Sequence, residues 1–114
     1  MRHTIEPSSL KTDLVAFGVR NNLRPTRLEV LGPAKDVESD VWLEDGLLLS
    51  GIDLDPDGKC GPYIEIMLQS QAQNHMTHSI AAVKRVELQT SQGIDESLEI
   101  EDASGAVTIM RFEG

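Results

Sequence analysis

The sequence "YIEIML" at residues 63–68 decides the fold, because it alternates strictly between two kinds of side chain. Ile64, Ile66 and Leu68 are apolar, whereas the positions between them include Glu65, which can face water. Successive side chains of a strand point to opposite faces of a sheet. The pattern therefore predicts a strand with one buried face and one wetter face.

The same two-residue period recurs on both sides of this stretch, from Thr26 almost to the C-terminus. Asp45–Gly46 is a typical hairpin dipeptide, because glycine adopts positive φ without strain, and it predicts a turn between two strands. The phase of the apolar residues shifts near Gly51, which predicts a β-bulge. Nearly all the connections are of hairpin length, so we expect the strands to pair antiparallel.

Only the N-terminal part of the chain shows a helical period, and it predicts a helix at residues 9–21. Pro25 prevents the helix from continuing through the residue before it. The apolar positions recur at spacings of three and four, and further apolar positions widen the stripe: Leu10, Leu14 and Phe17, widened by Val15 and Val19.

These patterns together predict a single domain over residues 1–114 with an α+β fold that is mostly β. We expect the helix at 9–21 to be followed by about seven short antiparallel strands within residues 26–113. Strongly twisted strands in this number curl or close, so the sheet is expected to form a curled sheet or a small barrel.

Composition limits the function classes. Ten basic residues stand against nineteen acidic ones, which gives a formal net charge of −9. Such a surface repels phosphate backbones and anionic lipids, so we expect neither a nucleic-acid nor a membrane partner. The single cysteine, Cys60, cannot form an intrachain disulfide, and the N-terminus lacks an apolar signal core. Both features favour a cytoplasmic protein.

The loop that precedes "YIEIML" resembles a calcium-binding loop, because Asp53, Asp55 and Asp57 stand two residues apart. An EF-hand needs a glutamate at position 12 of its loop, and here that position is Ile64, with Glu65 one residue late. The flanking segments are also strand-like. We therefore favour a solvated hairpin turn, and keep weak calcium binding by the three aspartates as the alternative.

His75 and His78 are the next candidates for a ligand or metal site. Their spacing suits one face of a helix, but on a strand residues three apart point to opposite sides. We therefore favour an interpretation in which His78 packs beside Met76 and Ile80 with its ring nitrogens bonded. Shared coordination of one metal by the two histidines is the alternative.

Arg111 alternates with Val107 and Ile109, so an otherwise apolar face is expected to carry a guanidinium. Such a group needs either a carboxylate, which we favour, or an anionic ligand. Trp42 falls on the charged side of its predicted strand. It is either an exposed anchor for a partner or, as we favour, a side chain covered by the N-terminal helix.

Several strings of the sequence together resemble a family of small bacterial proteins known as a domain of unknown function, with an HxTHxI motif. This resemblance implies an independent cytosolic domain and assigns no activity. His75 and His78 match the family motif, whereas residues 53–62 fall in a variable part of it. The strings are "LEVLGP" (28–33), "LLLSGI" (47–52), "IEIML" (64–68), "HMTHSI" (75–80) and "IDESLEIEDASGAVTIMRF" (94–112).

From the sequence we expect a small acidic domain that is not an enzyme, needs no cofactor and acts by binding a protein partner or by self-association. Sheet edges and Trp42 motivate this expectation, because an unpaired strand and an exposed aromatic ring both favour association. The alternative is a barrel-like module that binds a small ligand or a metal near His78 and Arg111, with Met76 beside them.

Overall fold

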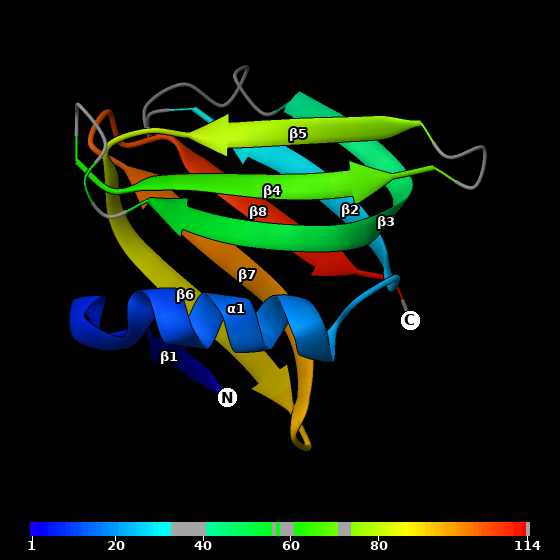
Figure 1. Cartoon of the computed structure of the whole chain (residues 1–114), viewed down its shortest axis with the longest axis horizontal. Helices are drawn as coiled ribbons and strands as arrows, with labels where there is room; N and C mark the ends of the chain where they lie inside the picture. Colours follow the sequence, from blue (N-terminus) through cyan, green and yellow to red (C-terminus); the bar gives the residue numbers. More distant parts are fainter. Residues whose placement is uncertain (33–40, 56, 58–60, 71–73, 114) are drawn as a thin grey trace.

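A computed structural model describes residues 1–32, 41–55, 57, 61–70 and 74–113, with the side chains of 41–45 left out. One α-helix and eight antiparallel strands within these residues confirm the predicted fold class (Figure 1). The elements are β1 (Arg2–Thr4), a 3₁₀ turn (Pro7–Ser9), α1 (Leu10–Arg20), β2 (Pro25–Leu31), β3 (Val41–Asp55), β4 (Tyr63–Gln69), β5 (His75–Ile80), β6 (Val83–Ser91), β7 (Ile94–Asp102) and β8 (Val107–Phe112).

The strands form one open, curled sheet in the order β1-β6-β7-β8-β2-β3-β4-β5. Of the two predicted forms the curled sheet is correct, because β1 and β5 each have a single neighbour and the barrel does not close. Two groups of strands lie on either side of the central β2 and β3. We call β1, β6, β7 and β8 the β1 wing, and β4 and β5 the β5 wing.

A very short link explains the curl of the sheet. β5 lies at one edge and β6 lies next to the opposite edge, yet only Ala81 and Ala82 separate the two strands in sequence. Two residues span little distance, so one corner of each wing must meet there. Two backbone hydrogen bonds hold the end of the link: Val83 N donates to Pro62 O at 2.9 Å, and Ala103 N donates to Ala82 O at 2.9 Å.

The predicted hairpin at Asp45–Gly46 is wrong, because β3 runs straight through it. The N-terminal part of β3 pairs with β2 up to Leu48, and the rest pairs with β4. Gly46 does adopt positive φ, at 85°, but it does so at a register shift opposite Thr26 and Arg27. The bulge predicted near Gly51 is confirmed by a second register shift between Leu49 and Gly51.

The helix covers the concave face of the sheet (Figure 1). Leu14 and Phe17 are fully buried against it, and Gly18 lets α1 approach β3 closely. A Cβ atom at Gly18 would lie 3.0 Å from Ile52 Cγ2, so a side chain there would force the helix away. Val15 and Val19 do not widen the buried stripe as predicted, because they are 47% and 75% exposed on the outer side of the helix.

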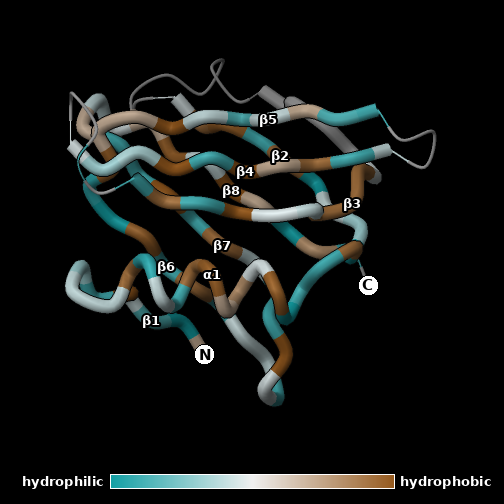
Figure 2. The backbone as a smooth tube through the Cα atoms, in the orientation of Figure 1, coloured by the Kyte–Doolittle hydropathy of each residue, from teal (hydrophilic) through white to brown (hydrophobic). Residues whose placement is uncertain are grey.

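Polar and apolar residues alternate along the strands, as the teal and brown segments of Figure 2 show, and the apolar side chains fill the core. Apolar side chains from both wings meet in one cluster on the concave face, which burial of apolar surface stabilises. Its fully buried strand residues are Leu28, Leu49, Ile64, Ile66, Leu68, Val86, Leu98, Ile100 and Met110. Across the described ranges, no helix is long and apolar enough to cross a membrane.

Candidate functional site

The three aspartates of the predicted calcium loop lie at the end of β3 and in the turn after it. Asp53 and Asp55 are exposed on the strand, and their carboxylates accept backbone hydrogen bonds from Leu54 N (2.9 Å) and Asp57 N (3.0 Å). The flanking elements are β3 and β4, not the helices that an EF-hand requires. Within the described residues no three His, Cys, Asp or Glu side chains gather as a metal site would need. Cys60 lies outside these residues.

The two histidines lie on β5 and point to opposite faces, as the strand interpretation requires. His75 is exposed, whereas His78 is half-buried and its Nε2 lies 3.5 Å from Thr108 Oγ1 of β8. Burial lowers the pKa of His78 below its ordinary value of 6.5, so its ring is neutral at pH 7. The structure thus brings His78 to β8 across the curl and keeps His75 away from it.

Among the described strands, β5 pairs with β4 on one side and with no strand on the other. Ser70 N donates to Asn74 O at 2.9 Å, which makes Ser70 and Asn74 a hydrogen-bonded pair at the hairpin end. Such pairs alternate along an antiparallel ladder, and the register continues as Gln69 opposite His75. The backbone N–H and C=O groups of His75, Thr77 and Ser79 therefore point away from β4.

Arg111 has the carboxylate partner that the sequence favoured. Its Nη1 lies 3.2 Å from Glu29 Oε1, and the Arg111 side chain is 52% exposed. Arg111 is three residues beyond Thr108 on β8, so it lies on the other face of the sheet from His78. The two residues do not share a site. Trp42 pairs by its backbone with Glu29, and its side chain lies outside the described residues.

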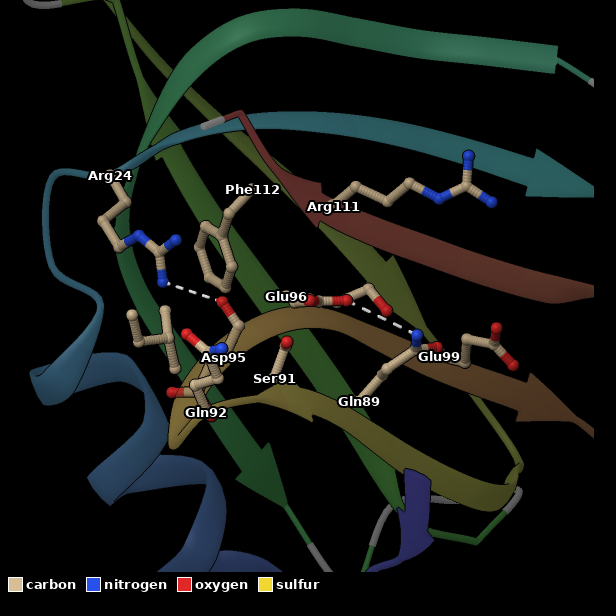
Figure 3. A pocket seen from close by; sticks show the side chains of 11 residues that line it. Arg24, Gln89, Ser91, Gln92, Asp95, Glu96, Glu99, Arg111 and Phe112 are labelled. Carbon is tan, nitrogen blue, oxygen red and sulfur yellow. Dashed lines mark hydrogen bonds between the residues drawn. The ribbon is translucent and has the colours of Figure 1, made fainter. Parts of the chain in front are cut away.

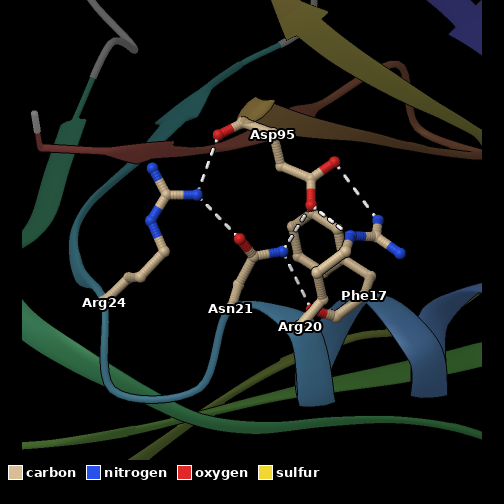
Figure 4. Close-up of polar contacts among 5 residues, drawn as sticks. All are labelled: Phe17, Arg20, Asn21, Arg24 and Asp95. Carbon is tan, nitrogen blue, oxygen red and sulfur yellow. Dashed lines mark hydrogen bonds and ion pairs between the residues drawn. The ribbon is translucent and has the colours of Figure 1, made fainter. Parts of the chain in front are cut away.

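A network of polar side chains centred on Asp95 joins the end of α1 to β7 (Figure 4). Asp95 is only 5% exposed. Arg20 donates to both of its carboxylate oxygens, from Nε at 2.6 Å and from Nη2 at 3.2 Å, and Asn21 Nδ2 donates at 2.7 Å. Arg24 Nη1 donates to Asn21 Oδ1 at 2.7 Å and to the backbone oxygen of Asp95 at 2.9 Å.

These contacts keep Asp95 charged. Burial by itself would raise the pKa of its carboxyl group. Hydrogen bonds from Arg20 and Asn21, with the charges of Arg20 and Arg24, outweigh burial and lower the pKa below its ordinary value. Asp95 therefore acts as a fixed anion that fastens the helix to the β1 wing.

An open groove of about 640 Å³ lies beside this network, over β6, β7 and β8 (Figure 3). At one end the guanidinium of Arg24 stacks over the Phe112 ring, with its carbon 4.1 Å from the ring centroid. Arg111 and Glu96 line the groove with other polar groups, and Ile94 adds an exposed apolar side chain. The groove thus combines guanidinium, carboxylate, amide and hydroxyl groups.

The sequence does not reveal this site, because the acid-rich residues 95–102 suggest a uniformly wet strand face. Asp95 and Ser97 are instead buried. On β6, Gln89 pairs with Ser97 of β7 and the next residue, Thr90, pairs with Asp95. Glu96 is therefore an extra, unpaired residue of β7, as in a β-bulge. The available signal was the set of polar side chains just after the helix, Arg20, Asn21 and Arg24, which need partners.

Comparison with family models, with curated proteins and with solved structures finds no match. The resemblance to the bacterial family with the HxTHxI motif therefore stays a prediction.

Proposed function

We propose that the protein is a non-enzymatic binding domain that self-associates by pairing β5 antiparallel with β5 of a second copy. The observation that supports this proposal is the outward direction of the backbone polar groups of His75, Thr77 and Ser79. An unpaired strand edge is a template for another strand, because each row of N–H and C=O groups complements an equivalent row.

The register of such a dimer follows from the outward-facing residues. A twofold axis at Thr77 places Thr77 opposite its own copy and His75 opposite Ser79 of the second copy. Each of these pairs would exchange two backbone hydrogen bonds, about six in total. The inward-facing Met76 and His78 would lie opposite each other across the axis and become more buried. A closed twofold contact of this kind ends at the dimer.

The composition of β5 leaves its edge open to association. Natural edge strands avoid pairing by means of charged side chains, proline or bulges. Residues 75–80 contain no Asp, Glu, Lys, Arg, Pro or Gly. The net charge of −9 opposes association of two copies at long range, so salt should strengthen the dimer by screening this repulsion. Strand pairing alone buries little area, which indicates a weak complex.

Binding rather than catalysis is supported by the protonation state of the buried acid. A general acid or base works best with a pKa near the working pH. Asp95 instead has its pKa lowered by Arg20 and Asn21, against the effect of burial, and both of its oxygens already accept hydrogen bonds.

Analytical ultracentrifugation over a wide concentration range tests the proposal with two variants. Thr77→Pro removes an N–H that does not bond to β4, so the monomer should stay folded while the dimer is lost. Thr77→Val keeps the backbone donor, and its dimer should persist. Circular dichroism and thermal unfolding check that both variants fold.

A native protein that stays monomeric at millimolar concentration and high salt would overturn the proposal. A dimer that Thr77→Pro leaves unchanged would overturn it as well. Capture of an extended segment of another protein, with no homodimer, would assign the same edge to a different partner and refute self-association.

A further inference from the structure

We propose that the groove beside Arg24 binds a small zwitterion of the amino-acid class, with its carboxylate on Arg24 and its ammonium group near Glu96. This inference is independent of the β5 edge, because the groove lies over β6, β7 and β8 in the β1 wing (Figure 3). Its basis is the state of the charged groups around the groove.

Arg24 presents an unused edge of its guanidinium. Its Nη1 donates two hydrogen bonds, to Asn21 Oδ1 and to the backbone oxygen of Asp95. Figure 4 shows Nη1 on the side of Asn21 and Asp95, with the rest of the guanidinium turned away from them. Nε and Nη2 accordingly have no hydrogen-bond partner among the described residues. These two groups form a fork that matches the two oxygens of a carboxylate.

The guanidinium of Arg24 is also held in place before any ligand arrives. Phe112 supports one of its faces at 4.1 Å, and the Phe112 ring itself packs against Phe17 of α1 with the ring centroids 5.7 Å apart. The two hydrogen bonds from Nη1 fix its rotation. A donor that is already ordered loses little conformational entropy on binding, which favours affinity.

The other charges of the groove are already compensated, with one exception. Asp95 pairs with Arg20, Glu99 with Arg2, and Arg111 with Glu29. Glu96 is exposed, and its side chain makes one hydrogen bond with the described residues, a long one from Gln89 Nε2 at 3.4 Å. Within the described part of the chain, Arg24 and Glu96 are thus the cation and the anion of the groove that form no side-chain ion pair, although Arg24 also lies in the field of Asp95.

The charges of Arg24 and Glu96 determine which class of ligand fits the groove. A dianionic phosphate would gain from Arg24 but would be repelled by the carboxylates of Glu96, Glu99 and Asp95. A zwitterion complements both ends. Ile94, which is 59% exposed at the rim, can cover an apolar side chain of the ligand. The groove is open, so we expect weak binding.

The test is a titration followed by ¹H–¹⁵N correlation spectra of the full chain. The probes are the proteinogenic amino acids and, for the best binder, its α-amide, its N-acetyl derivative and inorganic phosphate. We expect the amino acid to shift the amide signals of Ile94 and Ser97. The amide and the N-acetyl derivative should each bind at least about tenfold more weakly, because each loses one charge-assisted contact.

Two variants assign the contacts. Glu96→Gln should reproduce the loss seen with the N-acetyl derivative, and Arg24→Lys, which keeps the charge but removes the fork, should reproduce the loss seen with the amide. Lys84→Gln, at an exposed residue outside the groove, should bind like the native chain. Should Arg24→Lys fail to fold, the amide and Glu96→Gln carry the test alone.

The proposal is overturned by any of three results: no amino acid shifts these signals, the amide binds as well as the acid, or phosphate binds more tightly than every amino acid. The same titration on the Thr77→Pro monomer measures amino-acid binding without the dimer. Failure of ligand binding and failure of self-association are therefore distinguished.

Discussion

The two ends of the sheet differ in how they are held. At the β1 end, Arg2 bridges Glu87 and Glu99, and Arg85 bridges Glu87 and Glu101, so charges cross three neighbouring strands. At the β5 end, no described side chain of β3, β4 or β5 takes part in an ion pair. One edge of the sheet is crossed by ion pairs, whereas the edge strand β5 contains no Asp, Glu, Lys or Arg.

This difference separates two uses of a sheet edge. Charged side chains on an edge strand hinder the approach of another strand, because their desolvation is costly. β1 has three residues and begins with Arg2, whereas the six residues of β5 include no Asp, Glu, Lys or Arg. The side chains of the β1 wing therefore fix its edge, whereas β5 lacks the charges that would hinder the approach of a strand, as the proposed dimer requires.

The largest effect is expected where the β1 wing is fastened to the helix. Asp95→Ala should lower the free energy of unfolding by about 3 kcal/mol, because one N–H of the buried Asn21 amide loses its acceptor and the Arg20 guanidinium loses its ion-pair partner. Urea denaturation measures this loss. Asp53→Ala, at an exposed carboxylate of the β5 side, should change stability by less than about 0.5 kcal/mol. Equal losses of unfolding free energy in the two variants would contradict the proposed difference between the β1 end and the β5 end of the sheet.

The second-largest effect tests which backbone N–H groups of β5 form hydrogen bonds with β4. His78→Pro should destabilise the monomer by about 2 kcal/mol, because it removes an N–H directed at β4 and leaves a buried acceptor unpaired. Thr77→Pro, one residue earlier, removes an outward N–H and should cost less. Urea denaturation at dilute concentration compares the two monomers. The reverse order would show that the free side has been assigned to the wrong residues.

Adding charge should make the β5 edge behave like the β1 edge. In Thr77→Arg two guanidinium groups would meet at the twofold axis, and we expect dimerisation to weaken about fivefold at low salt. Analytical ultracentrifugation measures this change, and added salt should restore part of the affinity. Thr77→Gln serves as the neutral control of similar length. A stronger dimer in Thr77→Arg would contradict the proposed register.

The smallest effect concerns pH. Burial lowers the pKa of His78 below 6.5, so the unfolded chain binds the proton more readily than the folded chain. The resulting stability is fully present above pH 6.5 and is lost as the pH falls through the lower pKa of the folded state. His78→Gln should remove this contribution. Thermal unfolding between pH 7.5 and about 4.5, a range around the ordinary histidine pKa, measures it; an unchanged profile in the variant would refute it.

The sequence predicts features that depend on short-range alternation. The strand at 63–68 follows from its period, and the salt bridge of Arg111 follows from a guanidinium on an apolar face. The Asp45–Gly46 hairpin fails because positive φ at Gly46 fits a bulge as well as a turn. The choice between them depends on β2 and β4, which pair with different halves of β3.

The candidate groove depends on contacts that no local pattern contains. Asp95 is buried because Arg20, Asn21 and Arg24 reach it from a segment more than seventy residues earlier in the chain. Alternation predicts that Asp95 is exposed to solvent. It becomes a buried anion only when the helix packs against the sheet. Val15 and Val19 show the opposite case, since the orientation of α1 leaves apolar side chains in water.

The Ala81–Ala82 link has a consequence for how the two wings find each other. Because Ile80 and Val83 cannot separate by more than about 11 Å, the link keeps each wing at a high effective concentration for the other during folding. The entropy of loop closure grows only slowly with length, by about 0.6 kcal/mol for each doubling. Inserting flexible glycines between the two alanines should therefore slow folding and lower stability in small, regular steps, and this two-residue connection would act as the tether that bends the sheet.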